Sequence, residues 1–63
     1  MNIGFIGAGN VGFSLGKYLS VKGLSLSGFY SRNFNSSLEA ASFAGGRAYE
    51  NIEELVNNTD LIL

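Results

Sequence analysis

The stretch Gly7-Ala8-Gly9-Asn10-Val11-Gly12 has the spacing G-x-G-x-x-G and stands between two segments of different periodicity. Before it, residues 2–6 form a short apolar run of the kind that makes a buried strand. After it, apolar residues recur every three or four positions, which predicts a helix that ends near Gly23. A strand, a glycine-rich turn and a helix in this order indicate the start of a βαβ unit.

The same alternation continues to the last residue. Ser36 and Glu39 fit a capping box at the start of the second helix, and Asn51 with Glu54 resembles another helix start. Gly45-Gly46 is expected to end the second helix. The predicted strands are residues 2–6, 24–30, 47–49 and 61–63, and the predicted helices are residues 11–22, 36–44 and 52–56.

This order, β-α-β-α-β-α-β, predicts an α/β fold with a Rossmann-like parallel sheet and right-handed crossovers. The expected strand order is 3-2-1-4. We expect residues 1–63 to be the N-terminal part of a single dinucleotide-binding domain, truncated in the fourth strand, with the remainder and any substrate domain absent. An apolar strand without a neighbour favours pairing with another chain, so we expect self-association along that edge.

Composition excludes several classes of site. The chain has no Cys and no His, which excludes disulfides, a Cys/His zinc site, a Cys nucleophile and a His base. The net charge is −1 with scattered charges, so no basic stripe indicates a nucleic-acid partner. No apolar run is long enough to cross a membrane, and we expect a soluble, cytoplasmic protein.

Each glycine of the motif has a physical role in binding a pyrophosphate. Gly7 would allow the tight turn, Gly9 would let the phosphates approach the backbone, and Gly12 would let the helix pack closely on the strands. Gly16, one turn later, extends that close packing. A nucleoside-binding methyltransferase is the alternative, but its usual acidic residue before the first glycine is Ile6 here.

The end of the second strand bears on the choice of cofactor. NAD sites place Asp or Glu about 20 residues past the motif, where this chain has Tyr30, Ser31 and Arg32. Ser31, Arg32 and Asn33 offer hydrogen-bond donors, which suit the 2′-phosphate of NADP better than a bare ribose hydroxyl. NAD, FAD and an ordinary polar surface turn remain the alternatives. The candidate cofactor-binding residues are Gly7, Ala8, Gly9, Asn10, Val11, Gly12, Tyr30, Ser31, Arg32 and Asn33.

The remaining aromatic and acidic residues favour structural roles. Tyr49 is expected to pack on its strand, and the glutamates at 50, 53 and 54 are expected to be a solvated helix start rather than paired catalytic carboxylates. Packing in the core or against the sheet is predicted for Phe13, Tyr18, Phe29 and Phe43.

Residues 3–12, with Tyr30-Ser31-Arg32 and residues 52–63, resemble the opening of the pyrroline-5-carboxylate reductase and 6-phosphogluconate dehydrogenase-like superfamily. The nearest likeness is to reductases that carry a Rossmann-like domain and a helical C-terminal domain of unknown function. The resemblance implies NADP-dependent reduction of a C=N or C=O group by a dimeric full-length protein.

Residue by residue, the resemblance places Gly7, Gly9, Asn10, Val11 and Gly12 in the pyrophosphate loop, and Ser31 and Arg32 at the 2′-phosphate. It implies no catalytic residue within this chain, because the family places those residues beyond the fourth strand. A non-catalytic NAD(P)-sensing module is the second function class, since the same glycine loop serves both.

Overall fold

The computed structural model describes residues 1–7 and 10–63, and the side chains of residues 10–13 also lie outside the description. Strands and helices alternate along the chain, as the sequence predicts. The elements are β1 (Asn2–Ile6), α1 (Asn10–Val21), β2 (Ser25–Tyr30), α2 (Phe34–Ala44), β3 (Arg47–Tyr49), α3 (Ile52–Asn57) and β4 (Leu61–Ile62).

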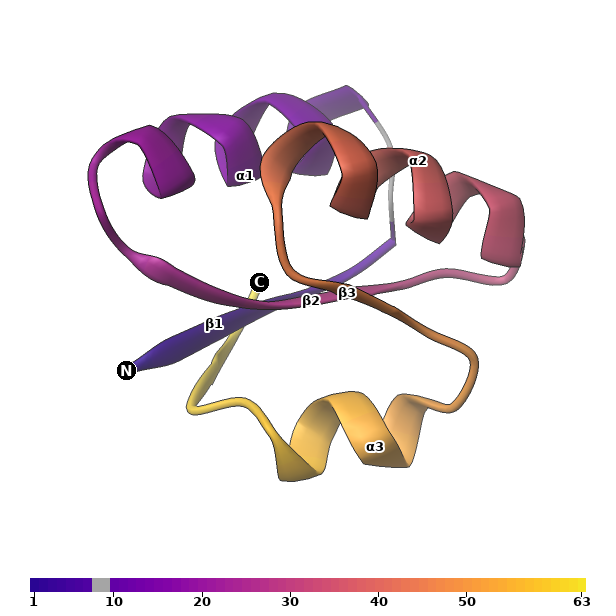
Figure 1. The fold of residues 1–63 in the computed structure, drawn as a ribbon. Helices are drawn as coiled ribbons and strands as arrows, with labels where there is room; N and C mark the ends of the chain where they lie inside the picture. The colour runs from indigo at the N-terminus through magenta and orange to yellow at the C-terminus, as the bar shows by residue number, and fades with distance from the viewer. Residues whose placement is uncertain (8–9) are drawn as a thin grey trace.

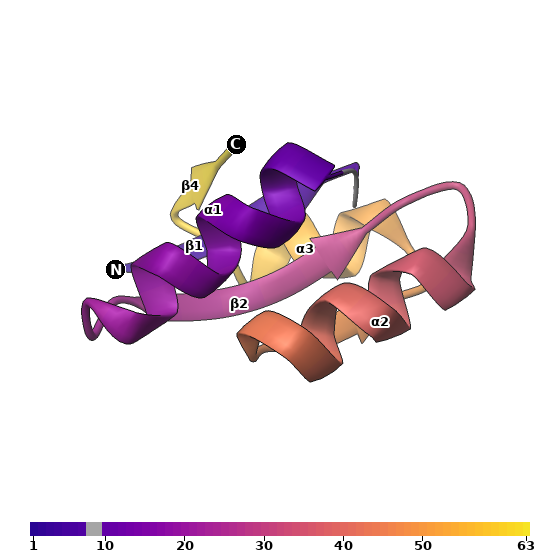
Figure 2. The same cartoon turned by 90° about the horizontal axis from the view of Figure 1, so that it is seen from above.

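The four strands form one parallel sheet in the order β3-β2-β1-β4. Helices α1 and α2 lie over one face of the sheet, and α3 lies under the other (Figure 1). Seen from above, α1 and α2 flank β2 along its length (Figure 2). The predicted order 3-2-1-4 and the Rossmann-like α/β class are therefore confirmed.

The core under α1 and α2 is built on two stacked rings. The Phe5 and Phe29 rings lie 5.0 Å apart at an interplanar angle of 15°, and both side chains are buried. A Cβ at Gly16 would lie 2.8 Å from the Phe29 Cζ atom, so α1 approaches the sheet more closely than a larger residue allows. The predictions for Phe29 and Gly16 are confirmed. The core cluster also contains Ile3, Ala40 and Ala44.

On the opposite face, α3 is joined to the sheet by one leucine and one pair of hydroxyl groups. Leu55 is fully buried, and a Cβ at Gly4 would lie 2.8 Å from its Cδ1 atom. The Ser27 Oγ and Thr59 Oγ1 atoms are 2.5 Å apart, and Thr59 Oγ1 donates to the Leu55 carbonyl oxygen. A hydrogen-bonded network therefore links β2 to the turn before β4.

Strand β2 contains an irregularity that requires a glycine. Its register with β1 shifts between Ile3 and Gly4: Ile3 pairs with Leu26 and Gly4 pairs with Gly28. Ser27 is therefore an extra residue in β2, as in a β-bulge. Gly28 has φ 148°, and a Cβ there would lie only 2.0 Å from the Arg47 carbonyl oxygen of β3. The backbones of β2 and β3 can pair here only because residue 28 has no side chain.

The end of α1 confirms the prediction for Gly23. Gly23 has φ 86°, its N–H donates to the Ser20 carbonyl oxygen, and the Leu24 N–H donates to that of Leu19. These two bonds make a Schellman motif with Gly23 at the C′ position. The second helix likewise ends at Gly45, as predicted.

The start of α2 differs from the prediction. The N-cap is Asn33, not Ser36: the Asn33 side-chain oxygen accepts from the Asn35 N–H at 3.0 Å, and the helix begins at Phe34. The capping-box interpretation of Ser36 is wrong because an earlier residue of the preferred N-cap type satisfies the helix start. Asn51 caps α3 through the Glu53 N–H at 2.7 Å, as expected.

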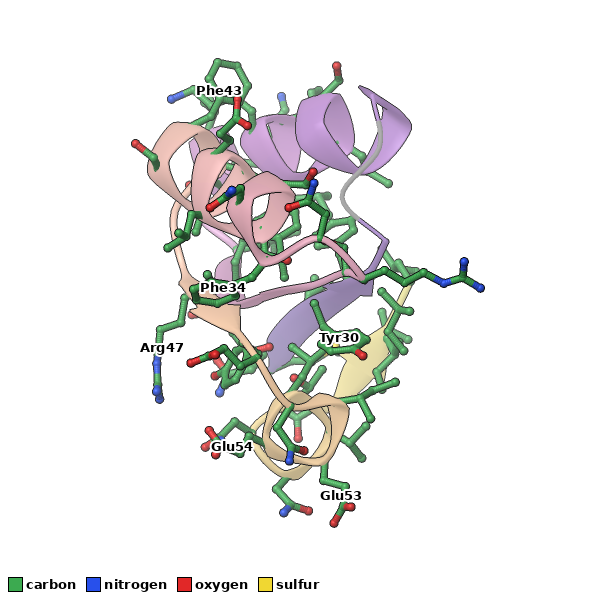
Figure 3. All side chains as sticks on the ribbon, turned by 90° about the vertical axis from the view of Figure 1, so that its right-hand side faces the viewer. Tyr30, Phe34, Phe43, Arg47, Glu53 and Glu54 are labelled. Atoms are coloured by element: carbon green, nitrogen blue, oxygen red, sulfur yellow. The ribbon has the colours of Figure 1, made fainter. Side chains whose placement is uncertain are left out.

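Two aromatic residues predicted to pack inside lie on the surface. Tyr18 is 59% exposed and Phe43 is 49% exposed, and Phe43 lies on the outer side of the helical layer (Figure 3). The Lys22 Nζ lies 5.5 Å from the Tyr18 ring centroid, and Lys17 is placed similarly over Phe43. These cation–π contacts give the rings a partner at the surface. The prediction for Phe13 falls on an undescribed side chain.

Tyr49 and the glutamates behave as predicted. Tyr49 is buried, with the Arg47 guanidinium 4.9 Å from its ring centroid. The carboxylates at 50, 53 and 54 are all exposed, and the last two lie in the first turn of α3, where the helix dipole favours negative charge.

Candidate functional site

A cleft lies at the carboxyl ends of β1 and β2. Its volume is about 590 Å³, within the range of small-molecule sites. In open α/β sheets, ligands bind outside the carboxyl ends of the strands, so the position of the cleft follows from the strand order. The lining residues are Ile6, Gly7, Tyr30, Ser31, Arg32, Asn33 and Ser36.

Gly7 makes the turn out of β1. It has φ 91°, and its N–H donates to the Tyr30 carbonyl oxygen at 2.6 Å, which ties the ends of β1 and β2 together. Apart from its chain neighbours, no described atom lies within 4 Å of the place where a Cβ of Gly7 would stand. The predicted positions Ala8 and Gly9 lie outside the described residues. Backbone positions 10–12 form the first turn of α1.

The hydroxyl of Ser31 is engaged within the protein. Ser31 Oγ donates to the Asn33 carbonyl oxygen at 2.6 Å and also lies 3.0 Å from Ser37 Oγ. The sequence suggests a free donor here, whereas in this geometry the hydroxyl hydrogen already has an acceptor. Ser31 therefore shapes the turn that follows β2.

Arg32 supplies the charge of the cleft. The residue is exposed, and its guanidinium makes no ion pair or hydrogen bond with the described atoms, which leave out residues 8–9 and the side chains of residues 10–13. Among the described residues that line the cleft, Arg32 is the one that carries a charge, and none carries a carboxylate. The next residue, Asn33, accepts from the Asn35 N–H with its side-chain oxygen, as the cap of α2. The lining is thus suited to an anion.

Tyr30 and Ser36 complete the wall. Tyr30 is half-buried, and its ring projects from the end of β2 toward the α3 side of the sheet (Figure 3). Ser36 is half-buried and lines the cleft from the first turn of α2. The sequence reasoning missed Ser36 as a site residue because it assigned this residue to the cap. If Asn33 is taken as the N-cap, Ser36 falls in the first turn of the helix, at the end of the sheet where the cleft lies.

Comparison with known proteins identifies the family of the chain. No curated protein and no solved structure matches the chain. None of the helices in the described part of the chain combines the length and the apolar character needed to cross a bilayer. The sequence profile of the GFO_IDH_MocA family, an oxidoreductase family with an NAD-binding Rossmann fold, matches residues 1–63.

This match covers every residue of the chain and agrees with the strand order of the sheet. It supports a nucleotide-binding oxidoreductase in general, while the narrower superfamily named from the sequence stays a prediction. The chain therefore belongs to the oxidoreductase family with an NAD-binding Rossmann fold.

Proposed function

We propose that this chain is the NADP(H)-binding part of an oxidoreductase that reduces a C=N or C=O group. The family match supports the oxidoreductase class and a dinucleotide cofactor. The lining of the cleft supports the choice of NADP. The substrate class and a homodimeric assembly rest on the resemblance of residues 3–12 and Tyr30-Ser31-Arg32 to the pyrroline-5-carboxylate reductase and 6-phosphogluconate dehydrogenase-like superfamily.

In this proposal the pyrophosphate lies at the start of α1. The open side of Gly7 leaves room for it, and the backbone N–H groups of the first helical turn point toward it with the positive end of the helix dipole. The residues proposed to bind it are Gly7, Ala8, Gly9, Asn10, Val11 and Gly12. When bound, the cofactor supplies the hydride through its nicotinamide ring.

The adenosine end of the cofactor would occupy the cleft at the carboxyl ends of β1 and β2. Tyr30, Ser31, Arg32 and Asn33 are the residues proposed to surround it. The observation that carries the proposal is the charge of the cleft lining. Among the described lining residues, Arg32 carries a positive charge and none carries a carboxylate. A carboxylate would bind a ribose 2′-hydroxyl and repel a 2′-phosphate, whereas a guanidinium can bind the phosphate through two parallel hydrogen bonds.

The test is a titration of the protein with NADPH and with NADH, for the wild type and for Arg32→Ala. Hydrogen bonds to charged groups contribute about 1.5–3 kcal/mol, so the variant should bind NADPH roughly 10- to 150-fold more weakly. NADH binding should change little. Added salt should weaken NADPH binding in the wild type more than in the variant.

The matched control is Arg47→Ala, because Arg47 is the other arginine of the chain and lies over Tyr49 on β3 rather than in the cleft. It should leave the preference for NADPH unchanged. Equal affinities of the folded wild-type protein for NADPH and NADH would refute the assignment of the 2′-phosphate to this wall.

A further inference from the structure

Ser37 is an unusual residue for the interior of a small protein. Its side chain is fully buried, together with those of Phe29 and Leu55, although serine is mostly found at surfaces. A buried hydroxyl without a hydrogen bond is destabilising, so the Ser37 hydroxyl needs a hydrogen-bond partner. The identity of that partner indicates the role of Ser37. The partner is the Ser31 Oγ atom, 3.0 Å away, in the turn that lines the cleft.

The direction of this hydrogen bond follows from the second contact of Ser31. A carbonyl oxygen can only accept, so the single hydroxyl hydrogen of Ser31 points at the Asn33 carbonyl oxygen, 2.6 Å away. Ser31 Oγ has no second hydrogen to give, and the bond to Ser37 must be donated by Ser37. The buried hydroxyl therefore donates outward, from the helix to the wall of the cleft.

The turn around Arg32 is consequently fixed on both sides. Ser31 is held by the hydroxyl of Ser37, and the Asn33 carbonyl oxygen also accepts from the N–H groups of Ser36 at 3.0 Å and Ser37 at 3.4 Å. Arg32 lies between these two fixed residues and is one of the residues that line the cleft. The backbone from which the guanidinium extends is thus set by α2.

We propose that Ser37 is a positioning residue for cofactor selectivity: it never touches the cofactor, but its hydroxyl holds the turn that aims Arg32 at the 2′-phosphate. The inference rests on the proposed function, since it assumes that Arg32 binds this phosphate. An arginine on a loosened turn can still attract an anion, but it loses the fixed geometry that a bidentate contact requires.

The experiment uses two ligands that differ only by one phosphate group, adenosine 2′,5′-bisphosphate and adenosine 5′-monophosphate. Their affinities are measured by calorimetry for the wild type, Ser37→Ala and Ser42→Ala. Ser42 lies on the same helix and is exposed, which makes it the matched control. Ser37→Ala should weaken the bisphosphate about fivefold, the equivalent of one hydrogen bond. The monophosphate should change less than twofold, and Ser42→Ala should change neither.

Two further variants separate positioning from a general loss of structure. In the Arg32→Ala background, Ser37→Ala should no longer change the ratio of the two affinities, because the residue acts through Arg32. Ser37→Cys is only slightly larger than serine and keeps a weak donor, so it should restore part of the ratio and serves as the test if Ser37→Ala does not fold.

Failure of the inference and failure of the proposed function give different results. A wild-type protein that binds both ligands equally would overturn the proposed function. A wild-type preference for the bisphosphate that survives in Ser37→Ala, or a loss that is equal for both ligands, would overturn the positioning role alone.

Discussion

Replacement of Gly28 by alanine should separate β3 from the rest of the sheet. The new Cβ would lie 2.0 Å from the Arg47 carbonyl oxygen, whereas real Cβ contacts essentially never fall under 3.0 Å. Strand β3 would have to move by roughly 1 Å, enough to break one or two hydrogen bonds of about 1 kcal/mol each. The strained φ of 148° adds about 1–3 kcal/mol.

Alanine also restricts the unfolded chain more than glycine does, and this offsets about 0.4–1 kcal/mol of the loss. Gly28→Ala should therefore lower the free energy of unfolding by about 2–4 kcal/mol. A chain of this length typically has only about 3–9 kcal/mol in total. Urea unfolding followed by far-UV circular dichroism should therefore show a midpoint roughly 2–4 M lower, for a slope of about 1 kcal/mol/M.

Gly23→Ala is the control for backbone strain alone. Gly23 also has a positive φ, of 86°, but in the described part of the chain no atom beyond its neighbours lies within 4 Å of the place of its Cβ. That variant should lose about 1 kcal/mol. If the Gly28→Ala midpoint were no lower than that of Gly23→Ala, the close approach of β2 and β3 would not contribute to stability and the reasoning would be wrong.

Three further substitutions test other parts of the fold. Phe29→Ala removes a fully buried ring stacked 5.0 Å from Phe5 and should lower the free energy of unfolding by about 3–5 kcal/mol, as chemical denaturation can measure. Asn51→Ala removes the cap of α3 and should lose about 1 kcal/mol in the same assay, while a loss under a few tenths would contradict the capping role. Tyr18→Ser removes an exposed ring whose contact is with Lys22 and should lower the unfolding free energy by no more than about 1 kcal/mol, so a larger loss would indicate packing that the structure lacks.

The sheet and its order could be predicted because local signals agreed with one another along the chain. Apolar runs gave the strands, and Gly23 and Gly45 marked the helix ends through backbone conformations that only glycine adopts easily. The start of α2 was misplaced because Asn33 and Ser36 are both good caps, and the choice between them depends on the path of the chain out of β2.

Features that depend on contacts between distant residues could not be predicted. Tyr18 and Phe43 lie on the outer surface of the helices because the space over the sheet is already filled by Phe29 and its neighbours. The bulge at Gly28 requires knowledge of the register of β1, although an isolated glycine in a strand is itself a weak sign of one. In the cleft, Arg32 was found from its spacing, whereas the burial of Ser37 was missed although Ser37 lies on the same helical face as Ala40 and Ala44.

The central position of β1 also has a kinetic consequence. It pairs on one side with β2, where Ile3 meets Leu26, and on the other with β4, where Ile3 meets Leu61. The Ile3–Leu61 pair closes a longer loop of chain than the Ile3–Leu26 pair. The entropic cost of closing the longer loop is only about 0.8 kcal/mol greater, because this cost grows with the logarithm of loop length. Five register pairs join β1 to β2 but only two join it to β4.

The shorter pairing, rather than the longer loop, should therefore make β4 the last strand to dock in folding and the first to open. Amide hydrogens held by the β1–β4 bonds, such as the Leu63 N–H bound to the Gly4 carbonyl oxygen, should exchange with solvent faster than those between β1 and β2. Transient opening would thus begin on the β4 side of β1 and leave the β1–β2 pair, which carries the cleft, intact.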